Sequence, residues 1–173
     1  MADGIRGKDY LKFPEDIIKG ILLHRQIDTF TDANPMYRKS KHRLHLKYGH
    51  YSGVIMDILY DHFLAKNWFK YSNEKLEIYV DHFYKSLKAN EDLLSEKTKK
   101  LMPYMITQNW LVSYETIAGI EKILIQMDYR TKHRANMYEA IVELKEFYTE
   151  FEEEFTLFFH ELIQFSNQKL LEI

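Results

Sequence analysis

Residues 56–68 read MDILYDHFLAKNW, and this stretch indicates a helix at the centre of the fold. Apart from Asp57, Asp61 and His62, it is almost entirely apolar, as are the residues just before it. A helix that is hydrophobic nearly all round is buried. Burying an ionised carboxylate is costly unless the group is paired or holds a metal ion. We therefore expect two buried carboxylates, at Asp57 and Asp61, that have a chemical role.

The rest of the chain shows the same helical periodicity. Apolar residues recur at intervals of three and four, and no stretch alternates cleanly enough to predict a strand. Gly and Pro are few, which favours long helices over many turns. Helices are predicted over residues 14–31, 35–48, 51–70, 76–87, 95–107, 109–128 and 132–170, the last broken near Glu152–Glu154. The sequence thus predicts an all-α fold in one compact multi-helix domain spanning residues 1–173.

Composition limits the classes of function. The net charge is −2, so no general basic field points to nucleic acid as a partner. There is no cysteine, which excludes disulfides, thiolate zinc sites and a cysteine nucleophile. No run approaches the roughly 20 apolar residues of a membrane span. We expect a soluble, cytoplasmic protein that binds neither nucleic acid nor membrane.

Helical spacing pairs the candidate site residues. Residues four apart share a helix face, so Asp57 and Asp61 project together, as do His24 and Asp28 on the first predicted helix. Two such pairs supply oxygen and nitrogen ligands of the kind that Mn, Mg, Fe or Zn accept. The same residues also suit ordinary structural pairs, such as Asp61 with Arg25. Spacing alone leaves both interpretations open.

Several motifs carry a family resemblance. They are ADGIRG (2–7), HRQID (24–28) followed by TDANP (31–35), DILYDHFLAKNW (57–68) and WLVSYETIAGIEKILIQMDYR (110–130). In this order they resemble the acyl carrier protein phosphodiesterases over most of the chain. The resemblance implies an atypical branch of the HD-type phosphohydrolases, with an HD-like helical architecture. It also implies a hydrolase that uses a divalent metal, Mn with Mg or Fe as alternatives. That enzyme removes 4′-phosphopantetheine from holo acyl carrier protein and leaves the apo form.

The resemblance also assigns roles to individual residues. It implies a metal site formed by Asp3, His24, Asp57 and Asp61, and a catalytic group formed by Arg25, Asp28 and His62. Metal-bound water is a nucleophile at neutral pH because the ion lowers its pKa. Asp28 or His62 is expected to orient or deprotonate that water, and Arg25 to bind a phosphoryl oxygen. Which carboxylate is a ligand and which is a base stays open.

Two departures from the family pattern affect the expected site. The adjacent His-Asp doublet that names the HD group is absent, since the doublets here run Asp-His. Relatives carry a His-bearing stretch ahead of the residues that match ADGIRG (2–7). We therefore expect Met1 to be an internal methionine and the architecture to lack its N-terminal helix. With a ligand missing, we also expect weak metal binding.

A basic segment and two alternative functions complete the expectations. The segment YRKSKHRLHLK (37–47) is rich in Lys and Arg, at Arg38, Lys39, Lys41, Arg43 and Lys47. It either docks an acidic carrier protein or forms a plain solvated helix face. The alternatives to the phosphopantetheine hydrolase are an HD-type nucleotide phosphohydrolase and a non-catalytic helical module that binds carrier protein. The sequence makes no prediction of oligomeric state.

Overall fold

The computed structural model describes residues 4–173, which form helices joined by turns and contain no strand. The α-helices are α1 (Glu15–Ala33), α2 (Pro35–Tyr48), α3 (Tyr51–Lys66), α4 (Leu76–Ala89), α5 (Glu96–Thr107), α6 (Trp110–Ser113), α7 (Ile117–Arg130), α8 (Ala140–Glu146) and α9 (Tyr148–Glu172). Short 3-10 helices are η2 (Asp9–Lys12), η3 (Trp68–Lys70), η4 (Glu91–Leu93) and η5 (Met137–Glu139). The predicted all-α fold is confirmed.

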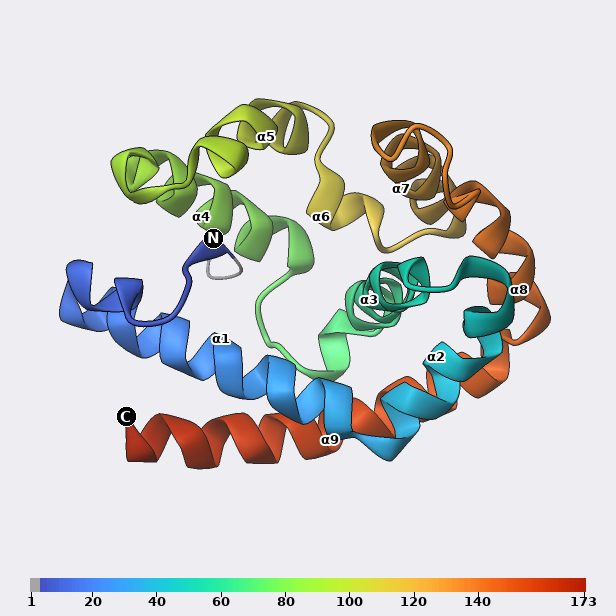
Figure 1. Cartoon of the computed structure of the whole chain (residues 1–173), viewed down its shortest axis with the longest axis horizontal. Coiled ribbons are helices and arrows are strands. Elements are labelled where there is room, and N and C mark those ends of the chain that lie inside the picture. Colours follow the sequence, from blue (N-terminus) through green and yellow to red (C-terminus); the bar gives the residue numbers. More distant parts are fainter. Residues whose placement is uncertain (1–3) are drawn as a thin grey trace.

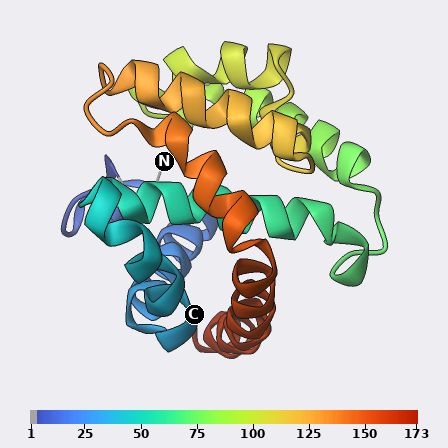
Figure 2. The same cartoon turned by 90° about the vertical axis from the view of Figure 1, so that its right-hand side faces the viewer.

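The helices form three levels, and α3 is the middle one (Figures 1 and 2). On one side of α3 lie α1, α2 and α9, and on the other lie α4 to α7. Helix α8 connects the two sides. This central place explains the apolar sequence of α3, since Ile55, Met56, Leu59 and Phe63 are fully buried against neighbours on both sides. The predicted central helix is confirmed.

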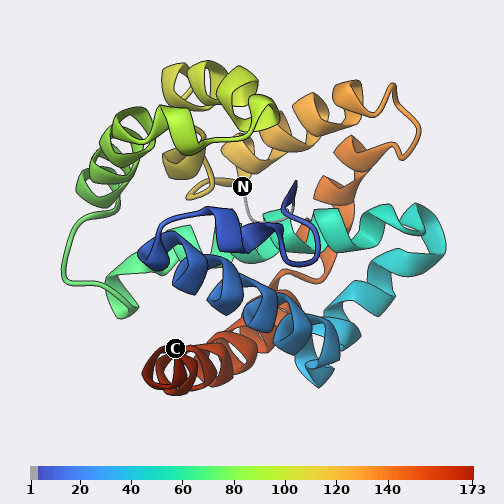
Figure 3. The same cartoon turned by 60° about the vertical axis from the view of Figure 1, so that its left-hand side comes forward.

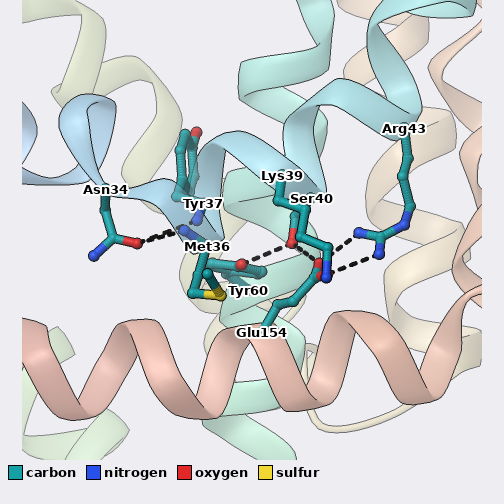
Figure 4. Close-up of polar contacts among 8 residues, drawn as sticks. All are labelled: Asn34, Met36, Tyr37, Lys39, Ser40, Arg43, Tyr60 and Glu154. Atoms are coloured by element: carbon teal, nitrogen blue, oxygen red, sulfur yellow. Dashed lines mark hydrogen bonds and ion pairs between the residues drawn. The ribbon is translucent and has the colours of Figure 1, made fainter.

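The turn between α1 and α2 fixes the direction of α2. The side-chain oxygen of Asn34 accepts hydrogen bonds from the backbone nitrogens of Met36 (2.9 Å) and Tyr37 (3.3 Å), as Figure 4 shows. Pro35 occupies the first helical position, where its missing N–H costs nothing. The cap therefore starts α2 at a defined residue and places Tyr37 in its first turn.

A buried ion pair ties α2 to α9 (Figure 4). Glu154 is 4% exposed and accepts hydrogen bonds from both terminal nitrogens of the Arg43 guanidinium and from the Ser40 hydroxyl. The ammonium of Lys39 lies 3.0 Å from the same carboxylate. Because Ser40 gives its hydrogen to Glu154, the hydroxyl of Tyr60 on α3 donates to Ser40 across 2.9 Å. The network joins α2, α3 and α9.

Residues 109–128, predicted as one helix, contain two. Thr116 caps a new helix, α7, by accepting a hydrogen bond from the backbone nitrogen of Gly119 at 3.0 Å. The turn between α6 and α7 is tight, since a β-carbon at Gly119 would lie 1.8 Å from the carbonyl oxygen of Ser113. The prediction missed this turn because it is closed by a contact between the two helices.

The helix predicted over 132–170 also differs from the one observed. Its first residues form a turn and η5, so α8 begins only at Ala140. The predicted break near Glu152–Glu154 is wrong, because α9 continues through it. Two of the three carboxylates there have a cationic partner, Glu152 with Lys66 at 2.9 Å and Glu154 with Arg43, and Glu153 is exposed to water, so the acidic run does not interrupt the helix.

The N-terminal segment packs on α1, where η2 contacts the helix (Figure 3).

None of the helices within residues 4–173 combines the length and the apolar character needed to span a membrane.

Candidate functional site

Asp57 and Asp61 lie on the accessible stripe of α3. Both are exposed, as is Val54 one turn earlier, whereas most of the helix is buried. The expectation that both carboxylates are buried is therefore wrong. They face two cavities instead, one of about 310 Å³ against α9 and one of about 260 Å³ against α4. Asp61 and Leu64 line both the α9 cavity and the α4 cavity, so Asp61 stands where the two cavities meet.

Asp57 is held by the phenol of Tyr37. The Tyr37 hydroxyl donates to Asp57 Oδ1 across 2.8 Å, so α2 positions a carboxylate of α3. The surrounding protein removes part of the solvation of Asp57 and so raises its pKa, and the nearby negative charges of Asp32 and Asp28 act in the same direction. The Tyr37 hydrogen bond and the positive charge of Lys41 oppose this rise. The net result of these opposing effects is a raised pKa for Asp57.

Asp61 has the more unusual environment. Water reaches its side chain, yet the surrounding protein is dense enough to remove much of its solvation. Burial raises the pKa of Asp61 to about 7, and the negative charge of Asp57 contributes to the rise. Tyr114 lines the α4 cavity beside Asp61, and burial together with the two carboxylates raises the pKa of its phenol. Asp61 therefore exchanges its proton near neutral pH, which suits a general acid or base.

His24 and Asp28 form a pair on α1. His24 Nδ1 lies 2.9 Å from Asp28 Oδ2, and both side chains are well exposed. The charge of Asp28 reaches Asp57, so the α1 pair and the α3 pair share one electrostatic field. Within residues 4–173, however, no three His, Asp or Glu side chains gather closely enough to hold a metal ion. The predicted ligand Asp3 lies outside the described residues.

Arg25 contacts the ADGIRG motif (2–7) itself. Its two terminal nitrogens donate to the carbonyl oxygens of Gly7 (2.9 Å) and Ile5 (2.7 Å), and its guanidinium lies 5.1 Å from the centre of the Tyr10 ring. The fork of donors that was expected to bind a phosphoryl oxygen is thus engaged with backbone. In this arrangement Arg25 positions the N-terminal segment against α1.

His62 points into the core, away from the two carboxylates. It is 1% exposed, and its Nδ1 lies 2.7 Å from the carbonyl oxygen of Tyr114 while its Nε2 lies 2.9 Å from the Tyr148 hydroxyl. Burial lowers the pKa of His62, so the ring is neutral at neutral pH. Because both ring nitrogens have protein partners, the structure does not bring His62 together with Asp57 and Asp61.

The comparisons with known proteins agree with the motifs around this site. The sequence matches the acyl carrier protein phosphodiesterase family over residues 1–162. The chain belongs to this family. Asp57, Asp61, His24 and Asp28 all lie within the matched range.

Curated relatives carry the family name along nearly the whole chain. The acyl carrier protein phosphodiesterase of Photorhabdus laumondii is 26% identical over 98% of this chain and 86% of its own length. The proteins of the same name from Pectobacterium atrosepticum and Shigella boydii are 25% and 26% identical, each over 99% of this chain and 89% of its own length. No solved structure matches the chain, so the HD-like architecture stays a prediction.

The sequence did not predict that two tyrosines of this acyl carrier protein phosphodiesterase family member belong to the site. Tyr37 and Tyr114 reach the carboxylates of α3 from distant segments. Both lie within or next to motifs that carry the resemblance, TDANP (31–35) and the motif over 110–130. Their place in or next to these motifs could have indicated a role at the site. An aromatic residue in a helical pattern, however, is more simply interpreted as part of the core.

The basic segment is only partly available to a partner. Lys39 and Arg43 are bound to Glu154, and Lys47 is bound to Glu143 at 2.8 Å. Arg38 is exposed and lines a shallow depression of about 190 Å³. Lys41 lines the same depression, but its ammonium lies 3.8 Å from Asp32. Arg38 thus remains on an accessible face, and Lys41 is partly engaged.

Proposed function

We propose that this protein hydrolyses the phosphodiester that joins 4′-phosphopantetheine to the serine of holo acyl carrier protein, and that Asp57 and Asp61 carry the chemistry. The observation that supports this most strongly is Asp61 at the junction of two cavities, with a pKa of about 7 and a second carboxylate one turn away. Membership of the acyl carrier protein phosphodiesterase family and the names of the relatives support the choice of substrate.

The chemistry requires two proton transfers. The oxygen of a water molecule bonds to phosphorus, the bond from phosphorus to the serine oxygen breaks, and the water gives up a proton while the serine oxygen gains one. At neutral pH a carboxylate with a pKa near 7 is present in both its ionised and its protonated form. It can therefore accept a proton from the water and donate one to the serine oxygen. We assign these transfers to Asp61. Tyr37 positions Asp57 through their hydrogen bond, which keeps the second carboxylate facing the same cavity.

We also propose a divalent cation, Mn first, with Asp57, His24 and Asp28 as the residues that would hold it once they approach one another more closely than in this structure. The donor chemistry fits, since carboxylate oxygens and an imidazole are ligands that Mn accepts. The clustering of negative charge around Asp57 fits too, because a cation would relieve a repulsion that now raises the pKa of that carboxylate. When bound, such an ion would supply positive charge opposite the phosphoryl oxygens.

The proposed partner, holo acyl carrier protein, is expected to dock on the accessible part of α2. Carrier proteins of this kind are acidic, and α2 provides positive charge at Arg38 and at Lys41, whose charge also acts on Asp57. Attraction between unlike charges speeds encounter and weakens as salt is added.

The test is release of 4′-phosphopantetheine from holo carrier protein in the presence of Mn²⁺, followed by mass spectrometry of the carrier. Asp57→Asn and Asp61→Asn are each expected to lower the rate by about 100-fold or more, the usual scale for loss of an acid–base group. Asp81→Asn is the matched control, because Asp81 begins a second Asp-His-Phe triplet on the exposed face of α4.

Metal binding is read separately from activity, as the rise in melting temperature that Mn²⁺ produces. That rise is expected in the unaltered protein and absent when Asp57 and Asp61 are both Asn. Full activity of Asp61→Asn would contradict the assigned chemistry, and an unchanged holo carrier protein with every divalent metal would contradict the substrate.

A further inference from the structure

The α4 cavity continues beyond Asp61 into a second, more polar hollow. The α4 cavity is walled by apolar side chains of α3 and α4, among them Leu64, Val80 and Phe83. It shares Ala65, Trp68 and Leu76 with the next hollow, of about 220 Å³. This distal hollow is lined by polar residues, including Ser72, Asn73, Lys75 and Glu115. The two spaces therefore adjoin, and together we call them the groove, which runs from Asp61 on α3 to the turn before α4 and is apolar near Asp61 and polar at its far end.

The indole of Trp68 is fixed at the junction of the two spaces. Its Nε1 donates to the carbonyl oxygen of Glu74 across 2.7 Å, and its ring lies 4.7 Å from the ring of Tyr79 on α4. A ring held by a hydrogen bond and a neighbouring aromatic side chain is already ordered. Binding of a ligand in the groove therefore costs little entropy for the Trp68 side chain.

A phosphopantetheine arm is long enough to reach from Asp61 into the distal hollow. From Asp61, which lines the α4 cavity, to the end of α3 at Lys66, the helix axis advances about 8 Å at 1.5 Å per residue, and Lys66 already lines the distal hollow. An extended arm has about thirteen bonds from phosphorus to sulfur, and at about 1.2 Å per bond, as in an extended peptide, it spans about 15 Å. An arm whose phosphorus lies near Asp61 therefore brings its thiol into the distal hollow.

The order of polarity along the groove matches the arm as well. Next to the phosphate the arm carries a carbon with two methyl groups, which suits the apolar walls near Leu64 and Phe83. Its amides and thiol follow farther out, where the distal hollow offers polar side chains. The α9 cavity fits less well, since it lies among residues of α1, α2, α3 and α9 and shares no lining residue with the distal hollow.

We propose that the phosphopantetheine arm lies in the groove between α3 and α4, with its phosphodiester at Asp61, its dimethyl carbon against Phe83 and its thiol beyond Trp68. This inference rests on the proposed function and adds to it the path of the arm. It makes Phe83 and Trp68 binding residues for the arm. Figure 1 shows α4 and α6 on the same side of α3.

The test uses the fluorescence of Trp68 as a local probe. The chain has two tryptophans, so Trp110→Phe leaves Trp68 as the sole indole. The ligand is pantetheine, the arm without its phosphate, because Asp57 and Asp61 would repel a free phosphate group. Pantetheine is expected to shift the emission of Trp68 with saturation, and inorganic phosphate is expected to leave it unchanged.

Two matched truncations locate the binding site. Phe83→Ala is expected to weaken pantetheine binding about tenfold and to raise KM for holo carrier protein by a similar factor, the scale for an apolar group lost from a pocket. Ile163→Ala on α9 is the control, since Ile163 is 37% exposed and Phe83 is 38% exposed. Hydrolysis of a small phosphodiester without an arm is expected to be unchanged in Ile163→Ala.

The outcomes separate this inference from the proposed function. If holo carrier protein is hydrolysed but Trp68 does not respond, or both truncations act alike, the arm lies elsewhere and the inference is overturned. A dimer that buries Trp68 without ligand, seen as concentration-dependent emission, would also overturn it. If Trp68 responds but holo carrier protein is never hydrolysed, the groove stands and the proposed function fails.

Discussion

Replacing Asp61 with asparagine is expected to abolish hydrolysis and, at the same time, to stabilise the fold. The reason is the raised pKa of Asp61, about 7 against an ordinary 3.8. In that interval the folded protein binds the Asp61 proton more tightly than the unfolded chain does. Stability linked to this proton is fully present below about pH 4 and is lost as the pH rises through about 7. Asparagine does not ionise, so the variant does not lose this stability as the pH rises.

The magnitude follows from the two pKa values. The full difference corresponds to about 4 kcal/mol at about 1.4 kcal/mol per pH unit. Because water reaches the Asp61 side chain, screening reduces this, and we expect about 1–2 kcal/mol above pH 7. For a chain of this length that free energy corresponds to a rise in melting temperature of about 2–8 °C.

Urea unfolding of both proteins, followed by circular dichroism across this pH range with chelator present, measures the difference. The gain of Asp61→Asn should be near zero at about pH 4, should grow toward pH 7 and should level off above it. Asp81→Asn is the control, since the hydrogen bond from Lys85 lowers the pKa of Asp81 and its loss should give no gain. Equal stability of Asp61→Asn and the unaltered protein above pH 7 would refute the argument that this carboxylate is desolvated.

Two further predictions concern α2. Glu154→Gln leaves the half-buried Arg43 guanidinium without its counter-charge and is expected to lower the free energy of unfolding by about 1.5–3 kcal/mol, seen as a lower melting temperature, while Glu153→Gln on the exposed side of α9 should change little. A large loss in both variants would mean that the helix, and not the ion pair, is what the substitution damages. Arg38→Glu is expected to raise KM for holo carrier protein about tenfold at low salt and less at high salt, while Lys122→Glu on α7 should not. Arg38 is chosen over Lys41 because the charge of Lys41 also lowers the pKa of Asp57, and a salt-independent effect would place docking elsewhere.

Local order along the chain was predictable from the sequence because it depends on residues close to one another. Pro35 after Asn34 predicts the start of α2, and the structure places the cap there. The apolar run around Asp57 and Asp61 predicts a central helix, and α3 is that helix. Helical spacing also put each candidate pair on one face, and the contact between His24 and Asp28 bears this out.

Whether a side chain at such a position meets protein, water or an opposite charge was decided only by the tertiary structure. The sequence indicates that α3 is buried, but not that its acidic stripe faces two cavities, since cavities depend on how α4 and α9 pack against it. His62 follows Asp61 directly, yet the helical turn between neighbours sends it into the core to meet Tyr148. Desolvation is the main cause of the raised pKa of Asp61, and it arises from segments that come together only on folding, whereas the added charge of Asp57 comes from the same helix.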